Sequence, residues 1–417
     1  MSSPAPQFAR AETVRAEPSL LDGLALQPAD PLLALIGAYR RDPRPDKIDL
    51  GVGVFRDEAG GTPIMEAVKL AEERLVRDQL SKGYLGPEGD LGFFELLKPV
   101  VFGDAVQARE LAGLQTPGGT GALRLAAELI AAARPGARVL VGAPTWPNHL
   151  PILSAARLEV VAYPFFDVAS QTLLFERMAE ALEAARRGDV VLLHGCCHNP
   201  TGADLDPAQW RIVAEIVARR GLVPLVDLAY QGLGSGLDED AAGARLVLAQ
   251  AEEGLLAYSC DKNFGLYRER TGALFVRSGT EQARAVIQSN LLALARANWS
   301  MPPDHGAAVV RTILEDEALT AAWRCELAGM CARITGLRRV LAEADPALAP
   351  LARQHGMFST LPLTPAQVAA ARDAHGIYMA GSGRINIAGL TPATVAPFIR
   401  GLAAVTGRSP ATLEPIA

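Results

Sequence analysis

Between about Gly113 and Ser278, short runs of apolar and β-branched residues alternate with stretches in which apolar side chains recur at helical spacing. This alternation is typical of a mostly parallel sheet covered by helices on both faces, because helices usually connect parallel strands. After about Thr312 the pattern becomes mainly helical, and a last short α/β section follows. The apolar runs predict strands over residues 138–142, 159–164, 190–195, 222–228, 255–259 and 272–276.

One helix is marked clearly within the alternating region, and the apolar residues after Gly121 indicate a second. Asp206 is a typical N-cap and Pro207 a typical first helical residue, and Gly221 follows the last apolar position of the pattern. Residues 207–220 therefore predict a helix that crosses between parallel strands. The stretch 122–133 is apolar on most sides, which predicts a helix that is largely buried.

The length of 417 residues exceeds what one hydrophobic core usually serves, so we expect two domains. We predict a large α/β domain over residues 63–317 and a smaller α/β domain made from both chain ends, residues 21–62 and 318–417. Residues 1–20 match neither pattern and are expected to form an N-terminal extension, a candidate for disorder.

Composition narrows the class of protein. The net charge of −6 and the pI near 5.7 argue against a general attraction to nucleic acid or anionic membranes, and no apolar run approaches the roughly 18 residues that span a bilayer. The five cysteines lack paired C-x-x-C spacing, which argues against a disulfide framework and a zinc site. Residues 1–20 contain no apolar segment of a secretory signal. These features predict a cytoplasmic protein without a metal.

Chemistry-bearing motifs follow the predicted strands. Lys262 comes just after an apolar run, and Arg270 follows eight residues later. The lysine can form a Schiff base, and the arginine can hold a phosphate. A lone lysine or arginine is more often a solvated surface charge. Five further motifs in the chain favour a functional role for these two residues. The six motifs lie at residues 118–121, 145–149, 194–202, 227–230, 259–272 and 383–389.

In this order the motifs resemble those of the aspartate and aromatic-amino-acid aminotransferases, the class I, fold-type I group of pyridoxal 5′-phosphate (PLP) enzymes. The resemblance extends from about Leu24 to the C-terminus. It implies a seven-stranded sheet in the large domain, PLP as cofactor, amino acids and 2-oxo acids as substrates, and a homodimer with shared active sites. It also implies ping-pong transfer of the amino group from aspartate, aromatic amino acids or both to 2-oxoglutarate.

Several of these residues suit a cofactor on chemical grounds alone. Gly118, Gly119 and Gly121 open a helix, where backbone N–H groups can approach an anion, although an ordinary glycine-rich turn would look the same. Asp227 ends an apolar strand, where a buried carboxylate needs a cation, and a helix N-cap is the alternative role.

The resemblance assigns roles around the cofactor. Lys262 would bind PLP covalently and carry the proton, Asp227 would pair with the pyridine nitrogen, and Tyr230 would hold the phenolic oxygen together with Asn199. Trp146 would stack on the ring. The implied catalytic residues are Lys262, Asp227 and Tyr230, and the implied cofactor-binding residues are Gly119, Thr120, Trp146, Asn199, Asp227, Tyr230, Ser259, Lys262 and Arg270, with Tyr84 from the partner subunit and His149 and His194 behind the ring.

The resemblance also implies a substrate site. Arg384 would clamp the α-carboxylate, and Arg296 of the partner subunit would bind the distal carboxylate of aspartate or glutamate. Gly53, Trp146 and Asn199 would complete the site. A surface salt bridge is the alternative for either arginine.

Substrate preference is mixed in the implied pocket. Arg56 and Thr120 are typical of aspartate specialists, whereas Gly83 and Met301 could admit an aromatic ring. We therefore predict broad specificity for dicarboxylic and aromatic amino acids. The implied pocket-lining residues are Val54, Arg56, Thr62, Gly83, Thr120 and Met301.

One further departure lies next to the reactive lysine. Asp261 stands where relatives commonly carry serine, and its carboxylate should favour the charged form of the Lys262 imine. Two alternatives to an aminotransferase use the same scaffold: a PLP-dependent lyase or decarboxylase, and a PLP-binding regulator. Arg296 and Arg384 argue against the first, and the acidic charge balance argues against the second.

Overall fold

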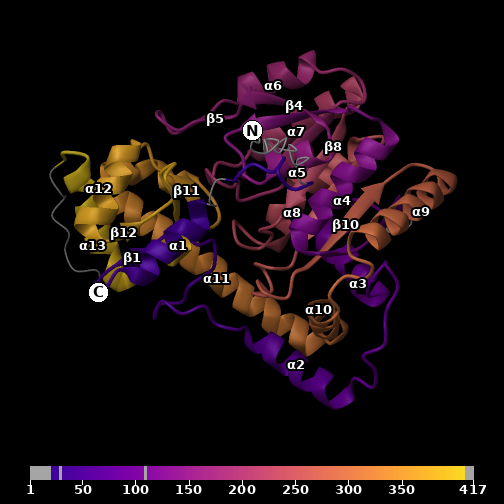
Figure 1. The fold of residues 1–417 in the computed structure, drawn as a ribbon, viewed down its shortest axis with the longest axis horizontal. Helices are drawn as coiled ribbons and strands as arrows, with labels where there is room; N and C mark the ends of the chain where they lie inside the picture. The colour runs from indigo at the N-terminus through magenta and orange to yellow at the C-terminus, as the bar shows by residue number, and fades with distance from the viewer. Residues whose placement is uncertain (1–19, 28–30, 108–109, 409–417) are drawn as a thin grey trace, which may run out of the picture.

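The computed structural model describes residues 20–27, 31–107 and 110–408, and its centre is a sheet of seven strands in the order β2-β10-β9-β8-β7-β3-β4 (Figure 1). Strand β10 runs antiparallel to β2 and β9, and all other neighbours pair in parallel. The predicted mostly parallel sheet is confirmed, with β2 as the strand that the pattern did not predict. The strands are β2 (Leu111–Pro117), β3 (Arg138–Ala143), β4 (Glu159–Pro164), β7 (Val190–His194), β8 (Val223–Leu228), β9 (Gly254–Ser259) and β10 (Thr271–Arg277).

Helices cover both faces of this sheet because successive strand residues point to opposite sides. In β7, Val190 and Leu192 join the core on one face, whereas Val191 and Leu193 join the core on the other. The first face is covered by α4 (Gly118–Ala133), α5 (His149–Ala155) and α9 (Glu281–Asn298). The second is covered by α3 (Leu91–Phe102), α6 (Phe175–Ala184), α7 (Pro207–Arg220), α8 (Leu237–Gln250) and α10 (His305–Glu315).

Both predicted helices are present. Helix α7 begins with a capping box between Asp206 and Gln209 and ends at Gly221, which adopts the left-handed conformation. Helix α4 buries most of its apolar residues, and it begins at Gly118, so the glycine motif forms its first turn. The N–H groups of that turn have no partner within the helix and are free to bind an anion.

The two ends of the chain pack together around a separate core. Strand β1 (Ile48–Asp49) pairs in parallel with β12 (Ile377–Tyr378), and Leu50 shares a buried cluster with residues between 337 and 402. Helix α11 (Glu317–Ala344) connects these elements to α2 (Glu66–Asp78) and α10. Figure 1 shows this part beside the layers that carry the large sheet. The remaining elements are α1 (Pro31–Arg41), β5 (Phe166–Asp167), β6 (Thr172–Leu173), η2 (Pro346–Arg353), β11 (Phe358–Thr360), α12 (Pro365–His375), β13 (Arg384–Asn386), η3 (Ile387–Gly389) and α13 (Pro392–Val405).

This arrangement suits a smaller domain built from both chain ends, while its predicted boundaries after residue 62 and before residue 318 stay a prediction. The predicted N-terminal extension lies outside the described residues apart from Leu20. Among the described residues, no helix is both long and apolar enough to cross a membrane.

Candidate active site

The candidate site lies at the carboxyl ends of the parallel strands. The chain continues from β3 to the edge strand β4 and then to β7, which lies on the other side of β3. The strand order therefore reverses between β3 and β7. Open α/β sheets bind ligands at such points of reversal. A cavity of about 210 Å³ opens at this edge. It is lined by Gly119, Thr120, Leu123, Trp146, His194, Asn199, Asp227, Ala229, Tyr230, Ser259, Asp261, Lys262 and Arg270. The predicted cofactor residues on this list lie at or after the carboxyl ends of β3, β7, β8 and β9, in helix α4, or directly before β10. Of the predicted set, Tyr84 and His149 do not line the described cavity.

Asp227, near the end of β8, is held by a buried histidine. Its Oδ2 lies 3.0 Å from His149 Nε2, and His149 Nδ1 lies 2.8 Å from the Thr145 hydroxyl, which also contacts His194. Burial raises the pKa of Asp227, but the hydrogen bond and charge interactions with His149 and His194 outweigh it and leave the pKa below its usual value. Asp227 is therefore an ionised carboxylate that faces the cavity and can pair with a cationic ring nitrogen.

Lys262 follows β9 and projects over an aromatic ring. Its Nζ lies 5.3 Å from the centroid of the Tyr230 ring. Burial lowers the pKa of this amine, while the carboxylates of Asp261 and Asp227 oppose that effect and Arg270 adds to it. The net pKa is lowered, so the neutral amine, which is the nucleophile and base, is more accessible than in a solvated lysine.

Asn199 and Tyr230 present hydrogen-bonding groups to the same space. Asn199 Nδ2 lies 3.3 Å from the Tyr230 hydroxyl, and Asn199 Oδ1 is buried without a hydrogen-bond partner in the structure. An orphaned buried acceptor needs a donor, since leaving it unpaired costs about 1–3 kcal/mol. A polar ligand in the cavity would supply one.

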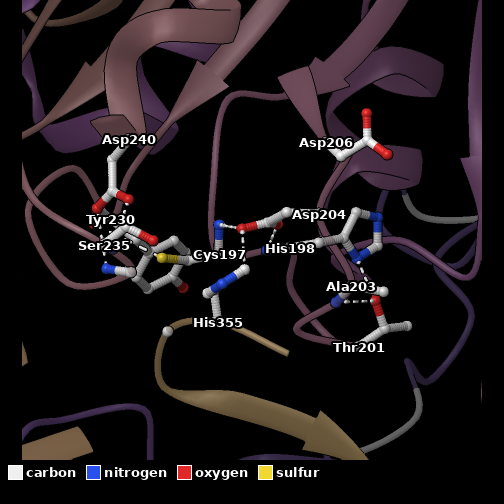
Figure 2. Close-up of polar contacts among 12 residues, drawn as sticks. Cys197, His198, Thr201, Ala203, Asp204, Asp206, Tyr230, Ser235, Asp240 and His355 are labelled. Carbon is white, nitrogen blue, oxygen red and sulfur yellow. Dashed lines mark hydrogen bonds and ion pairs between the residues drawn. The ribbon is translucent and has the colours of Figure 1, made fainter. Parts of the chain in front are cut away.

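The loop residues that directly precede Asn199 are held by the carboxylate of Asp204 (Figure 2). The Asp204 carboxylate accepts hydrogen bonds from the backbone N–H groups of Cys197 and His198, and it lies 3.6 Å from Nδ1 of His355. Asp204 raises the pKa of His355. His355 precedes β11, so this contact ties the loop to the part of the chain around the smaller core.

The rim near helix α4 is shaped for a phosphate. At Gly118 (φ 68°) a Cβ would lie 2.6 Å from Arg270 Nη2, and at Gly119 a Cβ would lie 3.1 Å from that of Ser259. A side chain at either glycine would fill this space. The first-turn N–H groups, the Ser259 hydroxyl and the Arg270 guanidinium form a donor set that suits a phosphate. Together with Asp227, whose carboxylate can pair with a protonated pyridine nitrogen, the residues present fit PLP.

Arg384 lies beside this cavity and is connected to it through an aromatic side chain. Its guanidinium stacks 4.6 Å from the centroid of Phe358, which contacts Tyr230 edge to face at 6.0 Å. One nitrogen donates to the carbonyl of Gly51, and Nε is buried without a partner. A Cβ at Gly53 would lie 2.6 Å from Phe358, so glycine is required for this packing. The free donor of Arg384 suits a carboxylate.

Two predicted residues lie on the surface, away from this cavity. Tyr84 is 98% exposed, and Arg296 is exposed and donates to the Ser300 hydroxyl at 2.6 Å. Their segments are neighbours, because the N–H of Leu85 contacts the sulfur of Met301 at 3.0 Å.

The implied specificity residues are dispersed. Arg56 pairs with Asp49 at 2.6 Å, Thr62 and Gly83 are exposed, and among the implied set Thr120 alone lines the described cavity.

The sequence reading missed three supporting side chains. Phe358 and Asp204 belong to none of the six motifs. The sequence around them gives no signal that Phe358 packs between Arg384 and Tyr230 or that Asp204 holds the loop before Asn199. Asp240 was also missed. With Cys196 and Cys197 it forms a group that could hold a metal ion. However, its oxygens accept hydrogen bonds from the N–H groups of Gly232, Gly234 and Ser235, and burial raises the pKa of both thiols, so the group is poorly suited to a metal.

Comparisons with known proteins agree with this geometry. The sequence pattern of the family described as aminotransferase class I and II matches residues 45–402. Tyrosine aminotransferase of Rhizobium meliloti (strain 1021) is 56% identical over 382 residues, which cover 90% of this chain and 98% of that protein. Aspartate aminotransferase of Salmonella typhi is 42% identical over 395 residues, 93% of this chain and 100% of that protein. The solved structure of an aromatic-amino-acid aminotransferase from Burkholderia pseudomallei, covalently bound to PLP, matches with a TM-score of 0.90 at 39% identity, covering 93% of this chain and 99% of that one.

Proposed function

The chain belongs to the class I and II aminotransferases, and on this premise we propose that it transfers the amino group of both aspartate and aromatic amino acids to 2-oxoglutarate in a ping-pong reaction. The observation that carries the proposal is the single cavity that joins Lys262, Asp227 and Arg270, with Arg384 beside it. Relatives named for tyrosine, aromatic amino acids and aspartate support both substrate classes.

Each side chain has one task in this reaction. When bound, PLP supplies the electron sink for the charge left at the substrate Cα after deprotonation. Asp227, held by His149, keeps the ring nitrogen protonated, and Arg270 holds the phosphate at the start of α4. Arg384 binds the α-carboxylate and so orients the Cα–H bond. The Lys262 amine, with its lowered pKa, takes that proton and returns it.

Arg296 is proposed to bind the distal carboxylate of aspartate, glutamate and 2-oxoglutarate from the partner subunit. Losing one partner of a desolvated charge pair costs about 2–5 kcal/mol, so Arg296→Ala should lower kcat/KM for aspartate roughly 30- to 5,000-fold. Phenylalanine and tyrosine carry no such charge and should lose much less. Arg384→Ala should impair both classes alike. Single-turnover absorbance measurements of the half-reaction with each donor give the loss for aspartate and for the aromatic amino acids separately.

The control for Arg296→Ala is Arg284→Ala on the same helix α9, where Arg284 donates a hydrogen bond to the carbonyl of Ser278. It should leave both substrate classes unchanged. Equal losses for aspartate and phenylalanine in Arg296→Ala would remove Arg296 from substrate binding.

We propose a homodimer with shared active sites, supported by the exposure of Tyr84 and Arg296 outside their own cavity. Mixing Lys262→Ala and Arg296→Ala subunits should restore about a quarter of the wild-type activity on aspartate, because half of randomly formed dimers would contain one complete site. Mixing Lys262→Ala with Arg384→Ala should restore none, since these two residues would serve the same site. If the first mixture is no more active than its parents, the sites are not shared in this way.

The cytoplasm is the proposed compartment. The five cysteines are all free in the described structure, which supports a reducing environment.

A further inference from the structure

We propose that Asp261 competes with the phosphate of the cofactor for Arg270, and that it thereby weakens the binding of the cofactor form that is not covalently attached to Lys262. This inference rests on the proposed function, because it takes Arg270 as the phosphate-binding cation. It concerns the strength of cofactor binding and adds no chemical step.

The structure places the Asp261 carboxylate inside the phosphate-shaped rim. Its Oδ2 forms an ion pair with Nη1 of Arg270, and its Oδ1 accepts from the N–H of Thr271 at 3.3 Å. Its own N–H donates to the Ser259 hydroxyl oxygen at 3.2 Å. The residue is only 3% exposed, and a Cβ at Gly118 would lie 3.2 Å from its Oδ2. Asp261 thus contacts two side chains of the proposed phosphate site, Ser259 and Arg270.

Within the proposed phosphate site, the cation Arg270 already has an anionic partner in Asp261. The other carboxylate that lines the cavity is Asp227. Asp227 is committed to the ring nitrogen in the proposed function. The charge of Arg270 is therefore already offset by Asp261, whereas a serine at this position would leave it free for the phosphate.

A phosphate monoester carries about −1.5 to −2 charges at neutral pH, so it must share Arg270 with a second anion. Arginine has five N–H donors, and both anions can contact it together. Their mutual repulsion in a partly buried site nevertheless opposes phosphate binding. In the PLP form, the covalent bond to Lys262 would compensate for the repulsion between the phosphate and Asp261. Pyridoxamine phosphate has no such bond, so it should be released more readily than from a site with serine.

The test compares ligand affinities of the apoenzyme and needs no catalysis. Asp261→Asn, which keeps the shape of the side chain, and Asp261→Ser should both lower the Kd for inorganic phosphate and for pyridoxamine phosphate by about 10- to 100-fold in titration calorimetry. The Kd for pyridoxamine, which lacks the phosphate, should not change. Glu110→Gln removes the same charge at the far end of β10, where Glu110 pairs with Arg277, and should leave all three affinities unchanged.

Equal or weaker phosphate binding in Asp261→Asn would overturn the proposal, because Asp261 would then orient Arg270 for the phosphate. An equal gain for pyridoxamine would overturn it as well, because the effect would then act on the ring. The proposed function is scored separately, by amino transfer of the wild-type protein. Absent amino transfer together with tighter phosphate binding in the variants would reject the function alone.

Discussion

Replacing Lys262 with alanine is expected to lower the rate of amino transfer by about 10,000-fold, at the upper end of what a positioned acid–base group contributes. The variant loses both the nucleophile that attaches PLP and the amine that moves the substrate proton. Single-turnover absorbance measurements with aspartate and with tyrosine measure the loss. Both donors should be affected alike, because the proton moves at the Cα that they share.

Two observations separate this effect from misfolding. The Lys262→Ala variant should still bind pyridoxamine phosphate, since Arg270, Ser259 and the first turn of α4 are unchanged. In the wild-type protein, borohydride reduction and peptide mapping should find the pyridoxyl group on Lys262. The matched comparison is Lys98, a lysine that is only 8% exposed and pairs with Glu95. Label on Lys98, or on any residue other than Lys262, would contradict the assignment.

Replacing Asp227 with alanine is expected to lower kcat/KM roughly 100- to 5,000-fold, from the cost of about 3–5 kcal/mol when one partner of a buried charge pair is removed. PLP should still bind, because the phosphate site and Lys262 are intact, but the ring nitrogen would lose the partner that keeps it protonated. Steady-state kinetics and the absorbance of bound PLP measure the two effects.

A graded variant sharpens the Asp227 prediction. Thr145→Val removes the hydroxyl that contacts His149 and should cause a smaller loss than Asp227→Ala, because Thr145 acts on the carboxylate only through that histidine. Near-normal turnover in Asp227→Ala would exclude Asp227 from the mechanism.

The alternating pattern predicted most of the large sheet because its central strands are buried on both faces and so are continuously apolar. Strand β2 escaped prediction because its sequence, LAGLQTP, contains Gly113, Gln115 and Pro117 and lacks such a run. It forms a strand because it pairs along its full length with β10, which lies far later in the sequence, from Thr271↔Pro117 to Arg277↔Leu111.

The residues of the candidate site also fall into those that the sequence predicts and those that only the structure reveals. Residues at strand ends, such as Asp227 and Lys262, could be predicted because the ends of parallel strands meet at one edge. Phe358, which connects Arg384 to Tyr230, could not be predicted, because it comes from a three-residue strand far from either in sequence. The sequence places the charge of Asp261 next to Lys262, but its pairing with Arg270 depends on the fold and is shown by the structure.

The proposed function requires one cavity to transfer amino groups from both dicarboxylic and aromatic donors. The most direct test is a single turnover of the PLP-loaded protein with excess aspartate and, separately, tyrosine, with products quantified by mass spectrometry. We predict one 2-oxo acid per active site from each donor, with the amino nitrogen recovered as pyridoxamine phosphate. Release of carbon dioxide and an amine, or of ammonia, without pyridoxamine phosphate would show a decarboxylase or a lyase and would exclude the proposed amino transfer.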